Sequence, residues 1–573
     1  MSLSIAEIKR IAKTITNEKQ RVHYNSILQL LGEFDVTAAN QTLLQTDDET
    51  YEQKQRFLAV ALFQIFKKLF IRHELKPLSA KLQATLSPEL VKFNQWCRKC
   101  YTSYKSKILS VIRNLTIEAS LALDCLDLYM QLLELEATHL APNSSDPYFP
   151  IQTLSDLVGA LWTSNIENSE IDPMTGQSTN FIILEFVEKY YKKFVDIQYY
   201  FQLEFNQLSN LDEKSHPDKL NGELGVAKWL AIANHDCHIT NTENVDLEVF
   251  VENPPQAVEN EQKFRTLLEQ NWLYILGGNL SIQQYKTILL ITHKRIVPHF
   301  LAPTKLMDFL TAAYNLQMTN DQDGSGVIPL LALNGLFELM KSFNLEYPNF
   351  YEKLYQLLTP SLMHVKYRPR FFRLMELFLS STHLSAHLVA SFIKRLARLS
   401  LSAPPGAIVS IIPFIYNLLK KHPNCMVMIH NPKYLSDPFD SPERRQELRT
   451  LRAQYVDPFD MNEPNPELTH ALDSSLWELQ TLANHYHPNV AALGRIFSQP
   501  FRKLHYNMED FLDWSYDSLL KAEATRKLKV LPTLEFETFD LALASGESEQ
   551  EVDEGGTDAV ESSKSVYLQK VAF

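Results

Sequence analysis

The chain has 573 residues, and its 55 basic and 68 acidic residues give a net charge of −13 at neutral pH. This balance excludes a protein that binds nucleic acid over its whole surface, although a local basic patch is compatible with it. Only 15 glycines occur, which argues against Gly-rich folds such as nucleotide-binding α/β sheets. Five cysteines over this length do not make a disulfide framework and indicate a reducing compartment.

Helical patterns follow one another from the first residues onward. Apolar side chains recur at helical spacing near residues 5–15, over 51–70, over 105–140 and over the aromatic-rich stretch 181–205. Alternation with a period of two is never long enough to predict a sheet, and no strict repeat period appears. The sequence therefore predicts an all-α protein, an irregular α-solenoid of the HEAT or armadillo kind.

Neither a secretory signal nor a membrane span is expected. Glu7, Lys9 and Arg10 interrupt the apolar pattern of the first residues, which a signal peptide does not tolerate. The longest nearly apolar run, 408–419, has twelve residues, whereas a span needs about 20. We expect a soluble intracellular protein without a membrane partner.

Composition divides the chain into four parts. The predicted parts are an N-terminal helical region over 1–260, a helical core over 261–425, a helical extension over 426–530 and a tail over 531–573. The tail has ten acidic residues against two lysines, a balance of −8, and little hydrophobicity. This composition predicts a largely disordered acidic tail.

Candidate metal and catalytic motifs are incomplete. The segment 321–332 begins like a calcium-binding loop but has Ala332 where a carboxylate should close the shell. Cys97 and Cys100 have the spacing of half a zinc site, and His485 and His487 lack a third ligand. No phosphate-binding loop, nucleophile elbow or zinc-protease motif occurs. We therefore expect no metal, no cofactor and no enzymatic activity.

A basic segment at 361–400 stands out from the acidic chain. It has seven basic residues against one acidic residue, Glu376, a balance of +6. On a helix that begins near His387, one face is apolar and the opposite face is basic. This pattern predicts a solvated basic face or a surface that binds an acidic partner or RNA phosphates. The candidate partner-binding or RNA-binding residues are Lys366, Arg368, Arg370, Arg373, Lys394, Arg395 and Arg398.

The same region carries a family resemblance. The string over 331–425, the two DPFD sequences at 437–440 and 457–460, SSLWEL at 474–479 and HYHP at 485–488 resemble the core domain of the CCAAT-binding-factor family. The match is to its nucleolar members of the small-subunit processome and extends over about 331–515. The first 320 residues match only in helical character and size.

The resemblance implies a non-catalytic nucleolar scaffold that acts in pre-rRNA processing and in small-subunit maturation and export. It implies an obligate heterodimer with a homologue of nucleolar protein fourteen, other processome proteins as further partners, and a partner-binding role for the family core. Tyr347, Phe350, Tyr351 and Tyr355 lie in the most family-like string and are candidate interface aromatics. Core packing is the alternative role for each of them, and both DPFD copies are expected to form structural turns.

Three other functions remain open from the sequence. The segment 366–398 is compatible with a module that binds pre-rRNA phosphates directly, without a helix-turn-helix, zinc-finger or basic-zipper signature for reading bases. A nuclear-transport adaptor would have regular tandem helix pairs, which the sequence does not show. An enzyme would need an enclosed pocket with convergent ionisable groups.

Overall fold

A computed structural model describes most of the chain. The described residues are 4–17, 23–34, 49–77, 87–114, 120–141, 146–164, 171–215, 222–235, 248–316, 327–343, 347, 349–437 and 439–527. The predicted tail at 531–573 and the first residues of the calcium-like loop lie outside them.

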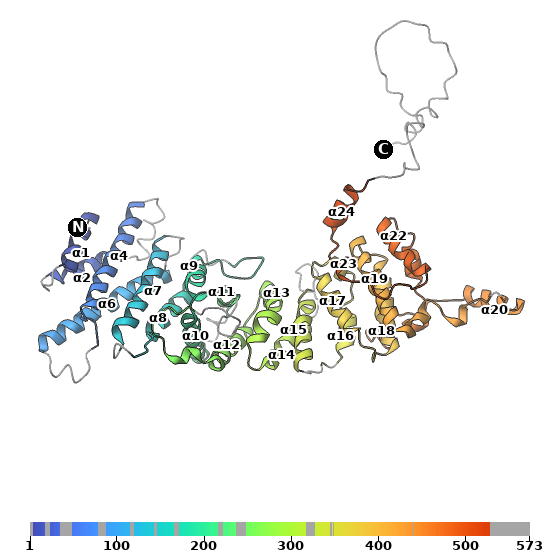
Figure 1. Cartoon of the computed structure of the whole chain (residues 1–573), viewed down its shortest axis with the longest axis horizontal. Helices are drawn as coiled ribbons and strands as arrows, with labels where there is room; N and C mark the ends of the chain where they lie inside the picture. The colour runs from blue at the N-terminus through green and yellow to red at the C-terminus, as the bar shows by residue number, and fades with distance from the viewer. Residues whose placement is uncertain are drawn as a thin grey trace, which may run out of the picture. The chain divides into compact units, whose positions relative to one another are not determined.

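Helices make up nearly all of the regular structure (Figure 1). In the N-terminal half the α-helices are α1 (Ile5–Asn17), α2 (Ser26–Glu33), α4 (Glu49–Ile71), α6 (Pro88–Asn114), α7 (Ser120–Leu140), α8 (Ile151–Trp162), α9 (Phe181–Phe186), α10 (Val195–Ser215), α11 (Glu223–Ala233), α12 (Glu261–Leu276) and α13 (Ile282–Ile291). They continue as α14 (Met307–Tyr314), α15 (Val327–Phe343), α16 (Phe350–Gln356), α17 (Arg368–Phe378), α18 (Ala386–Ser400), α19 (Pro405–Lys421), α20 (Pro442–Ala453), α21 (Trp477–Leu482), α22 (Pro488–Gly494), α23 (Glu509–Leu512) and α24 (Tyr516–Ala524).

Short π and 3-10 turns join several of these helices. The π turns are η2 (Val187–Tyr191) and η5 (Thr292–Ile296). The 3-10 turns are η4 (Gln256–Glu259), η6 (Val297–His299), η7 (Pro303–Leu306), η9 (Ser361–His364), η10 (Pro423–Met428), η11 (Pro432–Tyr434), η12 (Ala471–Asp473) and η13 (Arg495–Ser498).

Contacts divide the chain into two compact units. Unit 1 holds the described residues up to Leu399 together with Leu418–Leu476, and unit 2 holds Ser400–Asn417 with the described residues from Trp477. The four-part division drawn from composition, with boundaries at 260, 425 and 530, stays a prediction.

Unit 1 is a stack of helices in chain order. α4 packs on α1 and α7, α6 packs on α7 and α8, and α10 packs on α8 and α12. The series continues as α13 packs on α15, and α15 on α14 and α17 (Figure 1). No strand occurs in the described parts of the chain. Two isolated β-bridges are present there, one that pairs Ile171 with Ser178 and one that pairs Phe194 with Glu248. The predicted all-α solenoid is therefore confirmed.

Local chemistry explains where individual helices start and how closely they pack. Ser281 and Gln284 form a reciprocal capping box at the start of α13, and the Asn180 side chain caps α9. Gly335 of α15 lets α14 approach closely, because a Cβ there would lie 2.8 Å from a methyl group of Leu310. A larger residue at position 335 would push the two helices apart.

Unit 2 packs around the first part of α19. The Tyr416 hydroxyl donates to the carbonyl of Lys503 at 2.7 Å, and its ring lies edge-on to Tyr506 with centroids 4.9 Å apart. The hydroxyl of Ser410 donates to the carbonyl of Phe511 at 2.8 Å. Side chains of α19 thus hold the segment 503–511, which includes the start of α23, in place.

The other motifs noted in the sequence have ordinary surroundings. Cys97 and Cys100 are buried on α6 and form no disulfide. His485 Nδ1 accepts a hydrogen bond from the backbone amide of His487 at 3.1 Å. No described helix is at once long and apolar enough to cross a bilayer.

Candidate functional site

Helix α18 has the two faces that its sequence predicts. Leu388, Phe392, Ile393 and Leu396 are buried on the apolar face. The opposite face holds the three basic residues of the helix, but a later segment of unit 1, residues 457–475, lies against it. The geometry of that contact decides what the basic residues can do.

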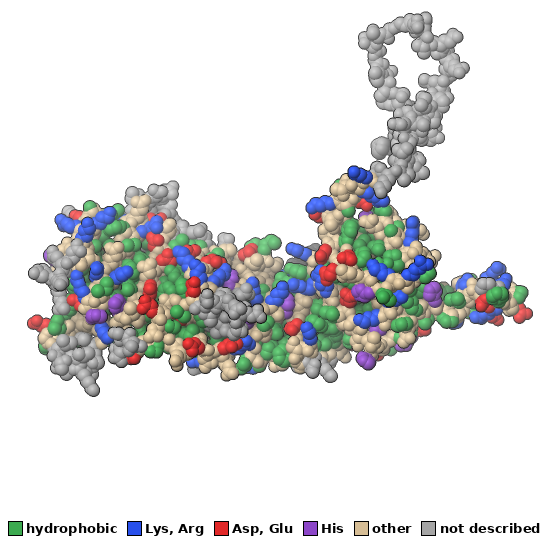
Figure 2. All heavy atoms as spheres, in the orientation of Figure 1, with side chains coloured by type: hydrophobic (Ala, Val, Ile, Leu, Met, Phe, Trp, Pro, Cys, Tyr) green, Lys and Arg blue, Asp and Glu red, His purple; other side chains and the backbone are tan. Residues whose placement is uncertain are grey.

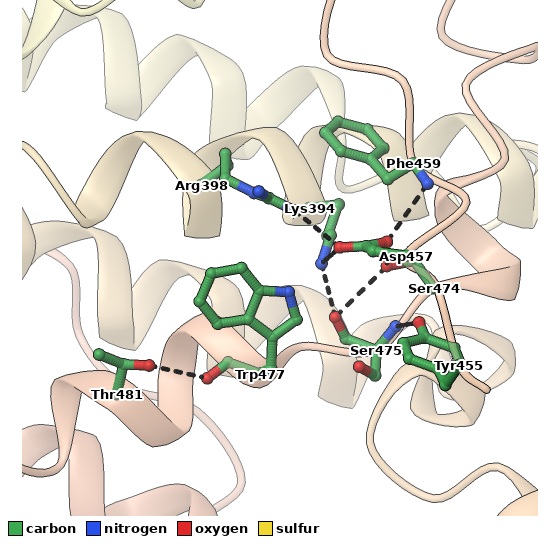
Figure 3. Close-up of polar contacts among 9 residues, drawn as sticks. All are labelled: Lys394, Arg398, Tyr455, Asp457, Phe459, Ser474, Ser475, Trp477 and Thr481. Atoms are coloured by element: carbon green, nitrogen blue, oxygen red, sulfur yellow. Dashed lines mark hydrogen bonds and ion pairs between the residues drawn. The ribbon is translucent and has the colours of Figure 1, made fainter. Parts of the chain in front are cut away.

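Asp457, the first residue of the second DPFD copy, is the centre of this contact (Figure 3). Its Oδ2 is 3.0 Å from the Lys394 ammonium and accepts a hydrogen bond of 2.7 Å from the Arg398 guanidinium. Its Oδ1 accepts from the hydroxyl of Ser474 at 2.5 Å and from the backbone amide of Phe459 at 3.2 Å. One carboxylate therefore joins two cations of α18 to the turn that carries it.

Further bonds extend this arrangement, which we call the Asp457 cluster: Lys394, Arg398, Tyr455, Asp457, Ser474 and Ser475. The Lys394 ammonium donates to the Ser475 carbonyl at 2.6 Å, and the Ser475 amide donates to the Tyr455 hydroxyl at 3.1 Å (Figure 3). The Lys394 side chain is 0% exposed, so its charge is compensated inside the protein.

Arg395 and Ser391 of α18 also have partners within unit 1, and the Arg395 guanidinium donates to the Met461 carbonyl at 3.4 Å. The Arg395 guanidinium donates to the Leu358 carbonyl at 2.8 Å and lies 4.4 Å from the ring centroid of Tyr355. The Ser391 and Thr469 hydroxyls are 2.6 Å apart. The polar face of α18 is therefore a packing surface for residues 457–475.

This finding corrects the expectation of an open basic face on α18. Lys394 is fully buried, and Arg395 and Arg398 are bound by internal partners. Arg368 is also buried and donates to the Met363 carbonyl at 2.8 Å. None of these four is placed to present a free charge to RNA or to an acidic partner.

The other three predicted basic residues retain exposure. Lys366 is exposed, and Arg370 and Arg373 are half-buried on α17. The charge of Arg370 lies near His293 of η5 and adds to the burial that lowers the pKa of this histidine. These three of the seven predicted basic residues therefore keep some contact with solvent.

The predicted interface aromatics are mostly in the core. Tyr355 is fully buried, and Phe350 and Tyr347 are buried beside Tyr314, with which each forms a ring contact. Tyr351 is half-buried, and its hydroxyl donates to the Phe378 carbonyl at 3.3 Å. Their availability to a partner stays a prediction, and their observed contacts are those of core residues.

Several strongly exposed apolar residues of unit 1 lie in the segment that contains the first DPFD copy. We call residues 431–456 the arm; it contains η11, the first DPFD copy and α20. Phe439 is 94% exposed and Val456 is 82% exposed. α20 contacts η11 and buries only Leu448, and Figure 1 shows it apart from the other helices of unit 1. In the sequence, Phe439 is one aromatic residue in a stretch rich in proline and arginine, and this pattern does not show that its side chain is exposed.

A hollow of about 410 Å³ lies at the base of the arm. Met428, Ile429, Tyr434, Leu435 and Tyr455 supply most of its apolar lining. The Arg452 guanidinium donates to the Tyr434 carbonyl at 2.6 Å and holds the end of α20 over η11. A hollow of this size accommodates one or two large apolar side chains of a partner.

The arm is basic as well as apolar. α20 has four arginines and two glutamates, and Figure 2 shows the Lys and Arg side chains along it. Arg444 pairs with Glu447 at 3.3 Å, whereas Arg449 is exposed and has no ion-pair partner in the described residues. Exposed arginines beside apolar side chains suit an acidic partner segment.

The described residues offer little for covalent or metal chemistry. No three His, Cys, Asp or Glu side chains among them lie close enough to hold a metal ion. Burial raises the pKa of the Cys425 thiol to about 11 and keeps it protonated.

Comparison with known proteins covers both halves of the chain. The profile of the CBF/Mak21 family matches residues 329–494, and a profile described as nucleolar complex protein 4-like, TPR repeats, matches residues 3–215. The resemblance of the core is confirmed. Family likeness also extends into the N-terminal half, where residue-level reasoning found only general helical character.

Individual relatives agree with both profiles. The chain is 58% identical over 573 residues to nucleolar complex protein 4 of Saccharomyces cerevisiae, with 100% of each chain covered. It is 36% identical over 458 residues to nucleolar complex protein 4 homolog A of Xenopus laevis, with 78% of each chain covered. The chain therefore belongs to the nucleolar complex protein 4 family, within the CBF/Mak21 family.

Proposed function

We propose that the chain is a nucleolar, non-catalytic scaffold of small-subunit biogenesis that binds a homologue of nucleolar protein fourteen through the arm. The family relationship supports the nucleolar assembly role. The observation that carries the choice of surface is the arm itself, where Phe439 and Val456 are exposed and Leu435 lines an apolar hollow. Other processome proteins are further partners of the same scaffold.

The energetics favour the arm over the basic helix as a docking surface. Burying Phe439 would remove a large apolar area from water at little cost, because it makes no ring contact in the described chain. Docking on α18 would first require displacement of residues 457–475 and separation of Lys394 from Asp457. A buried cation without its carboxylate is strongly unfavourable.

Affinity measurement with matched variants tests the proposal. We expect Phe439→Asp to weaken binding of the purified nucleolar protein fourteen homologue at least about tenfold, because an exposed aromatic side chain of the proposed interface becomes a charge. Met174→Asp is the matched control, since Met174 is 83% exposed and lies elsewhere in unit 1. Both variants should keep the thermal unfolding temperature of the wild type.

Two outcomes would contradict the proposal. Equal affinities for Phe439→Asp and the wild type would remove the arm from the interface. Loss of all association on ribonuclease treatment would replace the heterodimer with an RNA-mediated complex.

Direct binding of pre-rRNA is the second candidate function, and a specific observation favours it. Lys366, Arg370 and Arg373 stay outside the Asp457 cluster and retain exposure. Three phosphate contacts would give a slope of log K against log salt of about −2 on single-stranded RNA. A nuclear-transport adaptor stays a prediction that no observation favours.

A further inference from the structure

A second concave surface lies in the N-terminal half of unit 1, where the sequence assigned no role. It is a hollow of about 630 Å³ between α6, α7 and the start of α8. Residues of α6 line it along one side, from Arg98 through Ser106 to Arg113. At 1.5 Å per residue, this side is about 22 Å long, so the hollow is a groove.

A rigid polar network forms the floor of the groove. Glu136 of α7 is buried, and its Oε1 accepts from the Tyr101 hydroxyl at 2.6 Å and lies 3.0 Å from the Lys105 ammonium. The Lys105 ammonium also donates to the Thr153 hydroxyl at 2.7 Å. Lys105 and Glu136 therefore neutralise each other, and the floor offers a fixed shape without a net charge.

The ends of the groove are positively charged. Arg98 and Arg113 are exposed at opposite ends of its α6 side, and neither guanidinium has an ion-pair partner in the described chain. Across the groove, Asp156 accepts a hydrogen bond from Gln152 at 3.1 Å. Because Lys105 and Glu136 neutralise each other, the remaining charges of the groove lining are two arginines and one aspartate, and its net charge is positive.

The middle of the groove is largely apolar. Leu109, Leu140 and Tyr148 are half-buried along it, and Phe70 lies at its α4 side. An occupant must therefore have acidic groups toward its ends and an apolar side chain between them. Six or seven extended residues, at about 3.3 Å each, span this length.

These features favour a peptide over RNA. A phosphate backbone would carry a negative charge at every nucleotide, including through the apolar middle of the groove, whereas the unpaired cations of the lining, Arg98 and Arg113, lie at its two ends. A peptide can instead place its carboxylates at the arginines and its apolar side chain against Leu109. Bidentate pairing with carboxylates is the geometry that guanidinium groups favour.

We propose that the groove between α6, α7 and α8 binds an extended acidic segment of a partner protein, with carboxylates on Arg98 and Arg113 and an apolar side chain between them. This site is separate from the arm and does not depend on the proposed binding of nucleolar protein fourteen. It gives the N-terminal half a docking role of its own.

Site-specific photo-crosslinking of the full chain in cells tests the proposal. The photoreactive amino acid p-benzoylphenylalanine replaces Ser106, an exposed residue in the groove, and mass spectrometry reads the sequence of the captured segment. We expect one recurring segment of another protein, with a net negative charge and an apolar residue near the crosslink. Placing the probe at Lys99, which is exposed outside the groove lining, should not capture it.

Charge variants make the test specific. The double variant Arg98→Glu with Arg113→Glu should lower the crosslink yield at least about tenfold, because both charge-assisted contacts become repulsive. Lys92→Glu with Lys99→Glu changes the same charge on exposed residues of the same helix outside the groove and should leave the yield unchanged. Arg98→Lys with Arg113→Lys should give a yield between those of the wild type and the Glu double variant, because lysine keeps the charge but not the bidentate geometry.

Four results would overturn the proposal: nucleotide adducts, a crosslink to the acidic tail of this chain, captured segments without net negative charge, or no adduct at all. Equal loss of yield in both Glu double variants would also contradict it, since the effect would then come from the net charge of the helix. Loss of nucleolar protein fourteen binding in Phe439→Asp would not change any of these readouts, so the two proposals fail independently.

Discussion

The two DPFD sequences of unit 1 share four residues but have opposite environments. In both, the aspartate side chain accepts a hydrogen bond from the phenylalanine amide two residues later, at 2.9 Å in the first copy and 3.2 Å in the second. In the second copy, Asp457 also binds Lys394 and Arg398. In the first copy, Phe439 is almost fully exposed.

The comparison separates local from tertiary causes. An aspartate followed by proline favours the same turn wherever it occurs, so the turns are properties of the sequence itself. Whether the turn is closed against α18 or left open depends on which cations and apolar residues reach it in space. A closed copy stabilises the fold, and an open copy is available for binding.

The largest expected effect is the loss of the Asp457 carboxylate. Asp457→Ala leaves the buried Lys394 ammonium and the Arg398 guanidinium without their shared anion, and we expect the free energy of unfolding to fall by about 3–5 kcal/mol. Asp437→Ala, the same change in the open copy, should stay within about 0.5 kcal/mol of the wild type. Urea denaturation of both variants measures the difference, and equal effects would show that Asp457 is not a structural centre.

Replacement of the phenylalanine should also destabilise the protein more in the second DPFD copy than in the first, although by less than replacement of the aspartate. Phe459 is half-buried near the Lys394 ammonium, 5.9 Å from its ring centroid, so Phe459→Ala should cost about 1–2 kcal/mol. Phe439→Ala should leave stability nearly unchanged, because the side chain is exposed. Thermal unfolding of both variants checks this, and a destabilising Phe439→Ala would mean that the arm packs on the protein.

Lys228 is a buried lysine that has no carboxylate partner among the described residues, in contrast to Lys394, which has Asp457. Lys228 donates to the carbonyls of Trp162 at 2.6 Å and Ser164 at 2.9 Å, and burial lowers its pKa to about 8. The unfolded chain keeps this proton to about pH 10.4, so the unfolded state binds more protons between the two values. The Lys228 contribution to the free energy of unfolding therefore rises with pH across this window, by at most about 1.4 kcal/mol per pH unit.

Denaturation at pH 7.5 and pH 9.5 measures this contribution when the wild type is compared with Lys228→Met. We expect the wild type to gain stability relative to the variant at the higher pH. Parallel changes in the two proteins would show that Lys228 keeps its proton in the folded state.

The smallest expected effect concerns charge on the arm. Arg449 is exposed without an ion pair in the described residues, so Arg449→Glu should leave stability unchanged. If the arm binds an acidic segment, this variant should slow association with the partner a few-fold and reduce its salt dependence. Stopped-flow association at two ionic strengths tests this, with no change in rate as the contrary result.

The sequence predicted the fold class better than the site, for a physical reason. Helical periodicity and caps are local, so the helix over 51–70 and the two faces of α18 could be read directly. The partner of Lys394 is Asp457, 63 positions later, and no spacing rule connects them. Seven basic residues therefore resembled a surface, although four of them are buried or held internally.

Exposure was the second property that local pattern could not supply. Tyr347, Phe350 and Tyr355 resemble interface aromatics but pack in the core, whereas Phe439 resembles a turn residue and is exposed. Aromatic side chains serve both purposes, and only the surrounding helices decide between them.

Hydrogen–deuterium exchange of the chain alone and with the purified nucleolar protein fourteen homologue tests the central claim most directly. The account predicts that amides of the arm, residues 431–456, gain protection in the complex, while those of α18 exchange equally slowly in both states. Protection that appears on the basic segment at 366–398 and leaves the arm unchanged would contradict it.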